Sequence, residues 1–369
     1  MPAPAQHILI CFHDFAPGGT ERVALVLARE WVAAGRAVTI LCGLAEGPSR
    51  KLVDPRIRVV ELDPPIPRSP TSRLGLGRAM AARIAALKPD VAFLPGNFHF
   101  GIARALKRAA PGLPVVAKVS NPLLPALPAL TRPLLQPLAR KLLGAYVRPI
   151  DALIHMAPEL AKAEAAELER TRDVVIAEPN LPAGHTPPPR GEPSDPPTVL
   201  VIGRMEPQKN LALALRAFAE LRRKRAARLV VLGEGSQRPR LEALTRELGI
   251  AGDVAMPGYS TETEQHLSSA SALLLTSRCE GYPAVVSEAL AADVPVVATA
   301  CTPVLDSLLP SQIHGRIVAE NTPQALAEAL DAALDLPFAS GGLRPAGVAH
   351  HDAAASARAY LDLFDRLAL

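Results

Sequence analysis

Short apolar runs alternate along most of the chain with longer segments in which apolar residues recur every three or four positions. The run HILICFH at 7–13 predicts a buried strand, and ERVALVLAREWVAAG at 21–35 predicts an amphipathic helix. Further strands are expected at 37–43, 57–62, 90–95, 115–120, 151–156, 173–177, 198–203, 228–233, 253–258, 271–277, 294–299 and 315–319. Further helices are expected at 72–88, 100–109, 158–170, 209–225, 237–248, 283–292 and 350–368. Strands that alternate with helices predict a parallel sheet with helices on both faces.

One long interruption divides this alternation. The segment AEPNLPAGHTPPPRGEPSDPPT at 177–198 is rich in proline and glycine and almost free of apolar residues, which is typical of a linker between domains. At 369 residues the chain suits two domains of ordinary size. We therefore predict an α/β protein of two doubly wound parallel-sheet domains, 1–178 and 198–345, joined by a linker at 179–197.

Composition narrows the class of protein. Residues of the apolar type make up 49% of the chain, yet no run reaches the roughly 18–20 uncharged residues that a spanning helix needs. The N-terminus enters a strand-like run without a preceding basic region, so we expect no secretory signal. Four single cysteines without a C-x-x-C pair indicate a reducing, cytoplasmic location without disulfides or zinc. A net charge of +4 and 4% aromatic residues argue against nucleic-acid binding.

Two glutamates flank an apolar segment in EGYPAVVSE at 280–288. Gly281 favours a turn, and Pro283 fits the first position of a helix whose N–H groups at 284–286 would face a phosphate. Glu288 would lie about 7 Å along that helix, at the distance of a ribose from the diphosphate, and Glu280 on the other side could bind a sugar. The alternative is that both are ordinary surface acids.

Two further loops join a predicted strand to a helix. In VIGRMEPQKN at 201–210, Arg204 and Lys209 could clamp a diphosphate and stabilise its negative charge, although a solvated loop is the simpler alternative. In FAPGGTERV at 15–23, Gly18 and Gly19 would let the backbone approach a ligand. The third glycine of the dinucleotide-binding fingerprint is missing, so a plain turn is an equal alternative.

The segment at 121–150 is rich in leucine and proline, and its charges are all positive. They are Arg132, Arg140, Lys141 and Arg148. A basic apolar segment of this kind is typical of contact with an anionic membrane surface. A packed helical pair over the first sheet, with cations reaching into solvent, is the alternative.

Together, GGTERV, GRMEPQKN, GEGSQRPRLEALTRELGI, DVAMPGYS and EGYPAVVSEALAADVPVVAT resemble the retaining glycosyltransferases of family 4, which have the GT-B fold. This resemblance implies two Rossmann-like domains facing a central cleft, with the last helix at 349–369 packing back on the first domain. It implies transfer of a sugar from a nucleotide-diphosphate sugar to a hydroxyl acceptor. No metal and no other cofactor is expected.

The resemblance also assigns roles to matching residues. It implies a catalytic set of Glu280, Arg204, Lys209, Asn97 and His99. The donor-binding set that it implies is Gly18, Gly19, Arg204, Lys209, Met256, Gly258, Tyr259, Glu280, Gly281, Tyr282, Pro283, Ala284, Val285 and Glu288. Within this set, Glu280 would hold the donor sugar, Glu288 the ribose, and the backbone at 256–259 the base.

Two departures from the family pattern stand out. Many relatives have a histidine just after the strand matching DVAFLP, where this chain has Asn97, with His99 displaced by two positions. His99 is as compatible with a core position as with a sugar contact. A glycine-rich loop after VVAT is replaced by Thr302 and Pro303, which leaves the donor preference open.

The expected function is synthesis of a bacterial surface glycan or glycolipid, in the cytoplasm or on the inner face of the plasma membrane. A sugar-nucleotide epimerase or a phosphorylase of the same fold, and a non-catalytic subunit, are the alternatives.

Overall fold

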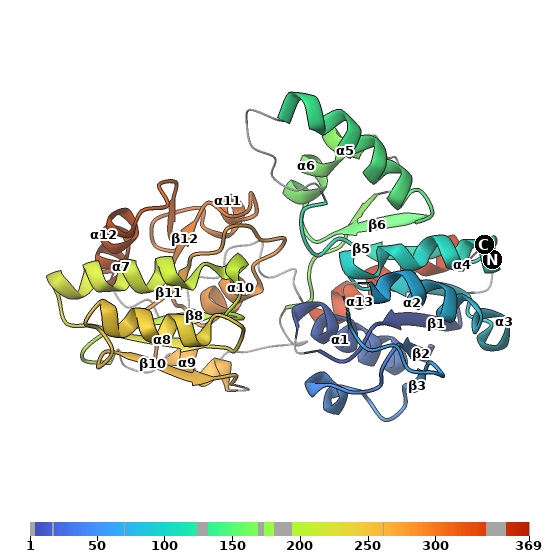
Figure 1. The fold of residues 1–369 in the computed structure, drawn as a ribbon, viewed down its shortest axis with the longest axis horizontal. Coiled ribbons are helices and arrows are strands. Elements are labelled where there is room, and N and C mark those ends of the chain that lie inside the picture. Colours follow the sequence, from blue (N-terminus) through green and yellow to red (C-terminus); the bar gives the residue numbers. More distant parts are fainter. Residues whose placement is uncertain are drawn as a thin grey trace. The chain divides into compact units, whose positions relative to one another are not determined.

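The computed structural model describes residues 4–16, 18–69, 71–123, 132–168, 173–180, 194–260, 262–336 and 352–368. The chain divides into two compact units. Unit 1 comprises residues 1–183 and 351–369, and unit 2 comprises residues 184–350. Each unit contains one parallel sheet, so the predicted class of two doubly wound α/β domains is confirmed (Figure 1).

Unit 1 contains seven strands in the order β3-β2-β1-β4-β5-β6-β7. The strands are β1 (His7–Phe12), β2 (Ala37–Cys42), β3 (Arg58–Glu61), β4 (Val91–Leu94), β5 (Val115–Lys118), β6 (Ala152–His155) and β7 (Val174–Val175). The helices are α1 (Gly19–Ala33), α2 (Ser72–Ala81), α3 (Ile84–Leu87), α4 (Ala103–Ala109), α5 (Arg132–Val147), α6 (Pro158–Leu168) and α13 (Ala353–Leu367), with 3-10 turns η1 (Pro48–Leu52) and η2 (Asn97–Ile102).

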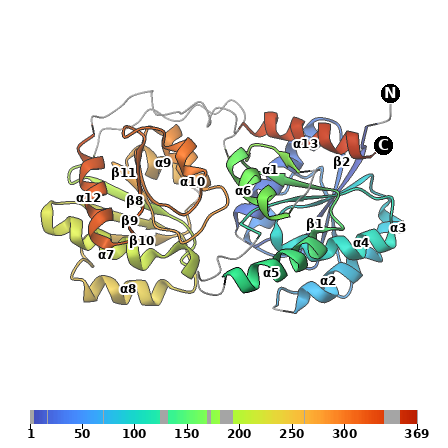
Figure 2. The same cartoon turned by 90° about the horizontal axis from the view of Figure 1, so that it is seen from above.

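Strand β1 shows why the apolar runs form central strands. Ile8, Ile10 and Phe12 join the core under α1 and α13, whereas Leu9 and Cys11 join a second core under α2 and α4. Successive side chains of a strand point to opposite faces, so a strand buried on both sides must be apolar throughout. Figure 2 shows α1 and α13 on one side of this sheet and α2 and α4 on the other.

The late helix α13 completes the core of unit 1. Tyr360 and Phe364 pack edge-on or tilted against Trp31 and Phe93, with ring centroids 5.2–6.2 Å apart. The indole nitrogen of Trp31 donates a hydrogen bond to the carbonyl of Ala357 at 3.2 Å. Residues separated by more than 300 positions in sequence therefore share one aromatic cluster.

Unit 2 contains six strands in the order β10-β9-β8-β11-β12-β13. The strands are β8 (Thr198–Ile202), β9 (Arg228–Leu232), β10 (Val254–Gly258), β11 (Ala272–Leu275), β12 (Val296–Thr299) and β13 (Gly315–Val318). The helices are α7 (Leu211–Lys224), α8 (Arg238–Glu247), α9 (Thr263–Ser268), α10 (Ala284–Ala291), α11 (Leu305–Leu308) and α12 (Pro323–Leu334), with the 3-10 turn η3 (Pro207–Lys209). Apolar residues of α7, α8 and α12 form one core with β8, β9 and β11.

Several helices differ from the sequence-based prediction. The helix expected at 72–88 is two helices, because Arg83 bonds to Met80, three residues back, and the regular four-residue pattern is interrupted. The start of the helix expected at 100–109 is the 3-10 turn η2. Helices α9, α11 and α12 and the turn η1 were not predicted. Among the residues described above, no helix is long and apolar enough to cross a bilayer.

Candidate functional site

The predicted functional motifs follow the central strands, where the strand order of each sheet reverses. In unit 2, β8 pairs with both β9 and β11, and in unit 1, β1 pairs with both β2 and β4. Ligands of open parallel sheets bind beyond the carboxyl ends of such central strands. Each unit therefore has its own candidate binding edge, and the loops there are described separately.

In unit 2, the loop after β8 crosses closely over the loop after β9. The amide of Gly203 donates to Leu232, and that of Met205 donates to Glu234, at 2.9 and 2.7 Å. Gly233 has a φ of +137°, and a Cβ there would lie 2.0 Å from the carbonyl oxygen of Gly203. Only glycine fits this crossing. It leaves Arg204 exposed at the rim of the sheet.

Lys209 and Glu280 meet at this edge, although 71 residues separate them. The Nζ of Lys209 lies 2.6 Å from Oε1 of Glu280, which is only 7% exposed. The hydroxyl of Ser277 donates to the same oxygen. The hydroxyl of Thr276 donates to the carbonyl of Lys209 at 3.1 Å, which ties the loop after β8 to the loop after β11. The structure thus brings an ammonium and a carboxylate of the predicted set into direct contact.

The turn that follows Glu280 is held by buried hydroxyl groups. Thr302, one of the residues that depart from the family pattern, donates from Oγ1 to the carbonyl of Gly281 at 2.9 Å. The hydroxyl groups of Tyr282 and Ser287 lie 2.6 Å apart. Hydroxyl groups from two segments therefore hold this turn.

The start of α10 differs from the expectation in two ways. Pro283 is the residue before the helix and not its first member. The amides of Ala284 and Val286 were expected to be open, but they donate to the carbonyls of Tyr282 and Pro283 at 3.1 and 2.9 Å. Within the described ranges only the amide of Val285, of these three, has no hydrogen-bond acceptor. The number of donors at this helix start is therefore smaller than predicted.

The remaining predicted donor residues lie around β10 and α10. Glu288 is half-buried on α10 and already interacts within the protein. Met256 is half-buried, and its carbonyl accepts a hydrogen bond from Arg238 at 3.0 Å. Gly258 has a φ of +94° and is followed by Tyr259, whose side chain is exposed.

In unit 1, the predicted glycine pair begins α1. Gly18 precedes the helix and Gly19 is its first residue. The carboxylate of Glu21 folds back over this start, because its Oε2 would lie 2.6 Å from a Cβ on Gly18. Burial raises the pKa of Glu21 above its ordinary value. The helix start that was expected to approach phosphate therefore already carries a carboxyl group.

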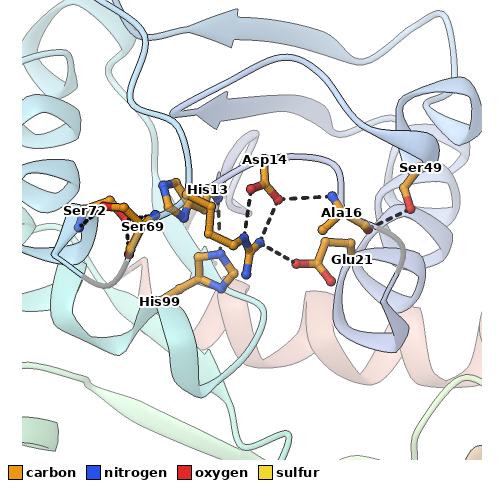
Figure 3. A network of polar contacts seen from close by, with 9 residues as sticks. His13, Asp14, Ala16, Glu21, Ser49, Ser69, Ser72 and His99 are labelled. Atoms are coloured by element: carbon orange, nitrogen blue, oxygen red, sulfur yellow. Dashed lines mark hydrogen bonds and ion pairs between the residues drawn. The ribbon is translucent and has the colours of Figure 1, made fainter. Parts of the chain in front are cut away.

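A charged network next to this helix was not predicted. Arg68 holds Asp14 through two hydrogen bonds of 2.8 and 2.7 Å and reaches Glu21 at 3.3 Å (Figure 3). Burial alone would raise the pKa of Asp14, but the hydrogen bonds and charge of Arg68 lower it below its ordinary value. His13 and Asp14 directly follow β1, so the strand-end rule could have identified them. The partner Arg68 lies 54 residues further along and left no local signal.

The two candidates after β4 have structural partners. His99 is 1% exposed, and its Nε2 accepts the amide hydrogen of His13 at 3.3 Å. Burial lowers the pKa of His99 to about 3, which keeps the ring neutral. Asn97 accepts the amide hydrogen of Ser120 and donates to the carbonyl of Asn121, both at 2.8 Å. In this conformation both side chains position loops.

The basic segment at 121–150 contains α5, while residues 124–131 lie outside the described residues. One side of α5 exposes apolar side chains, namely Leu135, Leu138, Leu142 and Tyr146. The predicted linker at 179–197 lies mostly outside the described residues as well. Across the described part of the chain, no group of three or more His, Cys, Asp or Glu side chains could hold a metal ion. Three of the four cysteines are buried, and Cys279 is exposed.

Two family profiles match the chain. The family described as "Glycosyl transferases group 1" matches residues 185–344, and the "Glycosyl transferase 4-like domain" matches residues 18–180. A curated relative from Campylobacter jejuni is N-acetylgalactosamine-N,N'-diacetylbacillosaminyl-diphospho-undecaprenol 4-alpha-N-acetylgalactosaminyltransferase, 35% identical over 101 residues. That alignment covers 27% of this chain and 27% of the relative. The chain thus spans about a quarter of this relative's length.

Solved structures match over nearly the whole chain. Sucrose-phosphate synthase from Thermosynechococcus elongatus gives a TM-score of 0.78 at 18% identity, covering 98% of this chain and 99% of its own. Alr3699/HepE of Anabaena, solved with UDP and glucose, gives a TM-score of 0.69 at 17% identity. That match covers 98% of this chain and 95% of the Anabaena chain. At these identities the likeness establishes the fold, which is GT-B.

Proposed function

Because the chain belongs to the glycosyltransferases of the group 1, family 4 type, we propose that it transfers a sugar from a nucleotide-diphosphate sugar to a hydroxyl acceptor with retention of configuration. The donor would bind at the carboxyl edge of the sheet in unit 2, and the acceptor at that of unit 1. The expected product is a surface glycan or a glycolipid, made in the cytoplasm.

The contact between Lys209 and Glu280 is the observation that carries this proposal. An ammonium group that follows the same central strand, β8, as an exposed arginine, Arg204, suits a diphosphate. The carboxylate of Glu280 presents Oε2 for a sugar hydroxyl, because Lys209 and Ser277 engage only Oε1. The similar fold of Alr3699/HepE, which was crystallised with UDP and glucose, supports a nucleotide-sugar donor.

The chemistry needs no protein nucleophile. The bond between C1 of the sugar and the diphosphate oxygen breaks, and the acceptor oxygen forms a new bond to C1 on the same face. The acceptor proton passes to the departing diphosphate, whose added negative charge Lys209 and Arg204 stabilise. Neither step calls for a metal ion, and none is proposed.

The first test separates the two glutamates. Glu288→Ala should weaken nucleotide binding about tenfold, because a carboxylate that accepts ribose hydroxyls contributes about 1.5–3 kcal/mol. Glu280→Ala should leave nucleotide affinity within threefold and lower turnover at least tenfold. Calorimetry with UDP, GDP and ADP, followed by product assays with each sugar nucleotide, measures both quantities. Equal and negligible effects of the two replacements would refute the assignment. Product formation without an acceptor would instead identify an epimerase.

We also propose that α5 brings the acceptor side to an anionic membrane. Its exposed leucines would enter the interface while Arg140 and Lys141 meet anionic headgroups. The protein should therefore float with phosphatidylglycerol vesicles at low salt and detach at high salt.

A matched pair of variants tests the part that α5 plays. Leu138→Ser with Leu142→Ser should reduce vesicle binding at least tenfold, because burying each leucine contributes about 1.5–3 kcal/mol. Leu52→Ser is the control, since Leu52 is similarly exposed but lies on η1. No flotation of the unmodified protein, or equal losses in both variants, would exclude this membrane contact.

A further inference from the structure

The side chains of two arginines and one histidine pack around one aromatic ring in unit 1. The guanidinium carbons of Arg73 and Arg68 lie 4.1 and 4.6 Å from the ring centroid of Phe98. The ring of His13 stacks on Phe98 at 5.3 Å with an angle of 17° between the planes. Phe98 belongs to η2, which follows β4, so the group lies at the binding edge of the sheet.

Arg68 is held in place before any ligand arrives. The carboxylate of Asp14 accepts hydrogen bonds from Nε and Nη2 of Arg68. The Nη1 of Arg68 is left without a hydrogen bond to any described residue. Ser69 and Ser72 bond to each other reciprocally, with the amide of each donating to the hydroxyl of the other at 3.1 and 3.0 Å (Figure 3). Ser69 and Ser72 are therefore tied together between the two arginines, which lowers the entropy cost of binding.

Arg73 carries the uncompensated charge of the group. Asp14 and Glu21 balance Arg68, but Arg73 is exposed and has no carboxylate partner in the part of the chain that the structure describes. The surrounding sequence adds to this excess, because residues 64–150 contain thirteen lysines and arginines but only one acid, Asp90. Two cations beside one ring repel each other unless an anion lies between them.

His13 is a buried polar neighbour of this group. Its side chain is fully buried, and its ring stacks on Phe98. Burial and the charge of Arg68 lower the pKa of His13, so the ring is neutral, with one donor and one acceptor nitrogen. Hydrogen bonding to the backbone of Pro67 and Ile66 acts on this pKa in the opposite direction, so His13 supports the Phe98 ring and is not counted as a ligand-binding group.

We propose that Arg73, Arg68 and Phe98 form a subsite for a phosphate group on the acceptor. This inference rests on the proposed function, which places the acceptor on unit 1. The planar guanidinium of Arg73 can bind two phosphate oxygens, Arg68 can donate from Nη1, and both groups pack on the ring of Phe98. The name of the Campylobacter jejuni relative contains a diphospho-undecaprenol, which supports a phosphate-bearing acceptor.

Calorimetry on the full chain tests the subsite without any transfer reaction. The probes are farnesyl diphosphate and inorganic pyrophosphate, and the variants are Arg73→Gln, Arg73→Lys, Arg78→Gln and Lys209→Met. Arg73→Gln should raise the Kd of farnesyl diphosphate about tenfold, the loss of one charged hydrogen-bonding group. Arg73→Lys, which keeps the charge but not the planar fork, should raise it about threefold. Arg78→Gln, a neighbouring exposed arginine of α2, should leave it within twofold.

The outcomes separate this inference from the proposed function. Unchanged binding in Arg73→Gln, or an equal loss in Arg78→Gln, would overturn it. A loss confined to Lys209→Met would place the probe in unit 2 and overturn it as well. Tighter binding of farnesyl diphosphate than of pyrophosphate would assign the subsite to a lipid-linked acceptor, and equal binding to a free phosphate-bearing one. Failure of nucleotide binding in the glutamate experiment would reject the proposed function while leaving an Arg73-dependent anion site intact.

Discussion

Lys209→Met is expected to lower the turnover number about 10²–10³-fold, the range found when one charge-stabilising donor is removed from an active site. Lys209 lies at the strand end where the diphosphate is proposed to depart, and its only ion pair in the described chain is with Glu280. Initial rates of product formation with the donor identified by calorimetry measure the effect. A change of less than threefold would exclude Lys209 from the chemistry.

Loss of folding must be separated from loss of chemistry in this experiment. Lys209→Met leaves the buried carboxylate of Glu280 with Ser277 as its remaining partner, which destabilises unit 2. The double variant Lys209→Met with Glu280→Gln removes both charges, so it should recover stability and still lack turnover. Arg223→Ala, which alters an exposed pair on α7, is the control and should retain activity.

The second large effect concerns stability. Lys118 and Glu178 form an ion pair in unit 1 at 2.7 Å, with side chains only 1% and 8% exposed. Lys118→Met should lower the free energy of unfolding by about 3–5 kcal/mol, because it leaves a carboxylate buried without its cation. Urea unfolding followed by fluorescence measures this directly, because Trp31, the single tryptophan, lies in the core of the same unit.

The pair is tested by removing both of its charges. The double variant Lys118→Met with Glu178→Gln should be less destabilised than Lys118→Met alone, since no charge then remains unbalanced. If Lys118→Met lowers the free energy of unfolding by less than about 1 kcal/mol, solvent reaches this pair.

The strands could be predicted almost completely from sequence. All thirteen expected strands are present, because a strand buried on both faces needs an unbroken apolar run, as in β1. Helix α12 was missed although Thr322 caps it and Pro323 begins it. Three of its five buried residues are alanines, whose short side chains give a weaker apolar signal than leucine or valine. Its packing against α7 makes up for this weak pattern.

The site was less predictable than the fold. Spacing identified Lys209 and Glu280 as candidates because both follow central strands, and the structure joins them. The amides at the start of α10 were misjudged because their state depends on the backbone angles of Pro283, which the sequence does not specify. The Asp14–Arg68 pair could not be predicted from sequence, because it connects two loops that lie 54 residues apart. Long-range pairs of this kind depend on topology and leave no local pattern.

The position of α13 has a consequence for the order in which the protein is made. The aromatic cluster of Trp31 and Phe93 lacks Tyr360 and Phe364 until residues 353–367 have left the ribosome. At about 5–20 residues per second, the nascent first unit waits roughly 10–40 seconds with this surface uncovered, while the whole of unit 2 is translated. Unit 1 is thus the first to be synthesised but the last to complete its core. Protection by a chaperone matters most during that interval.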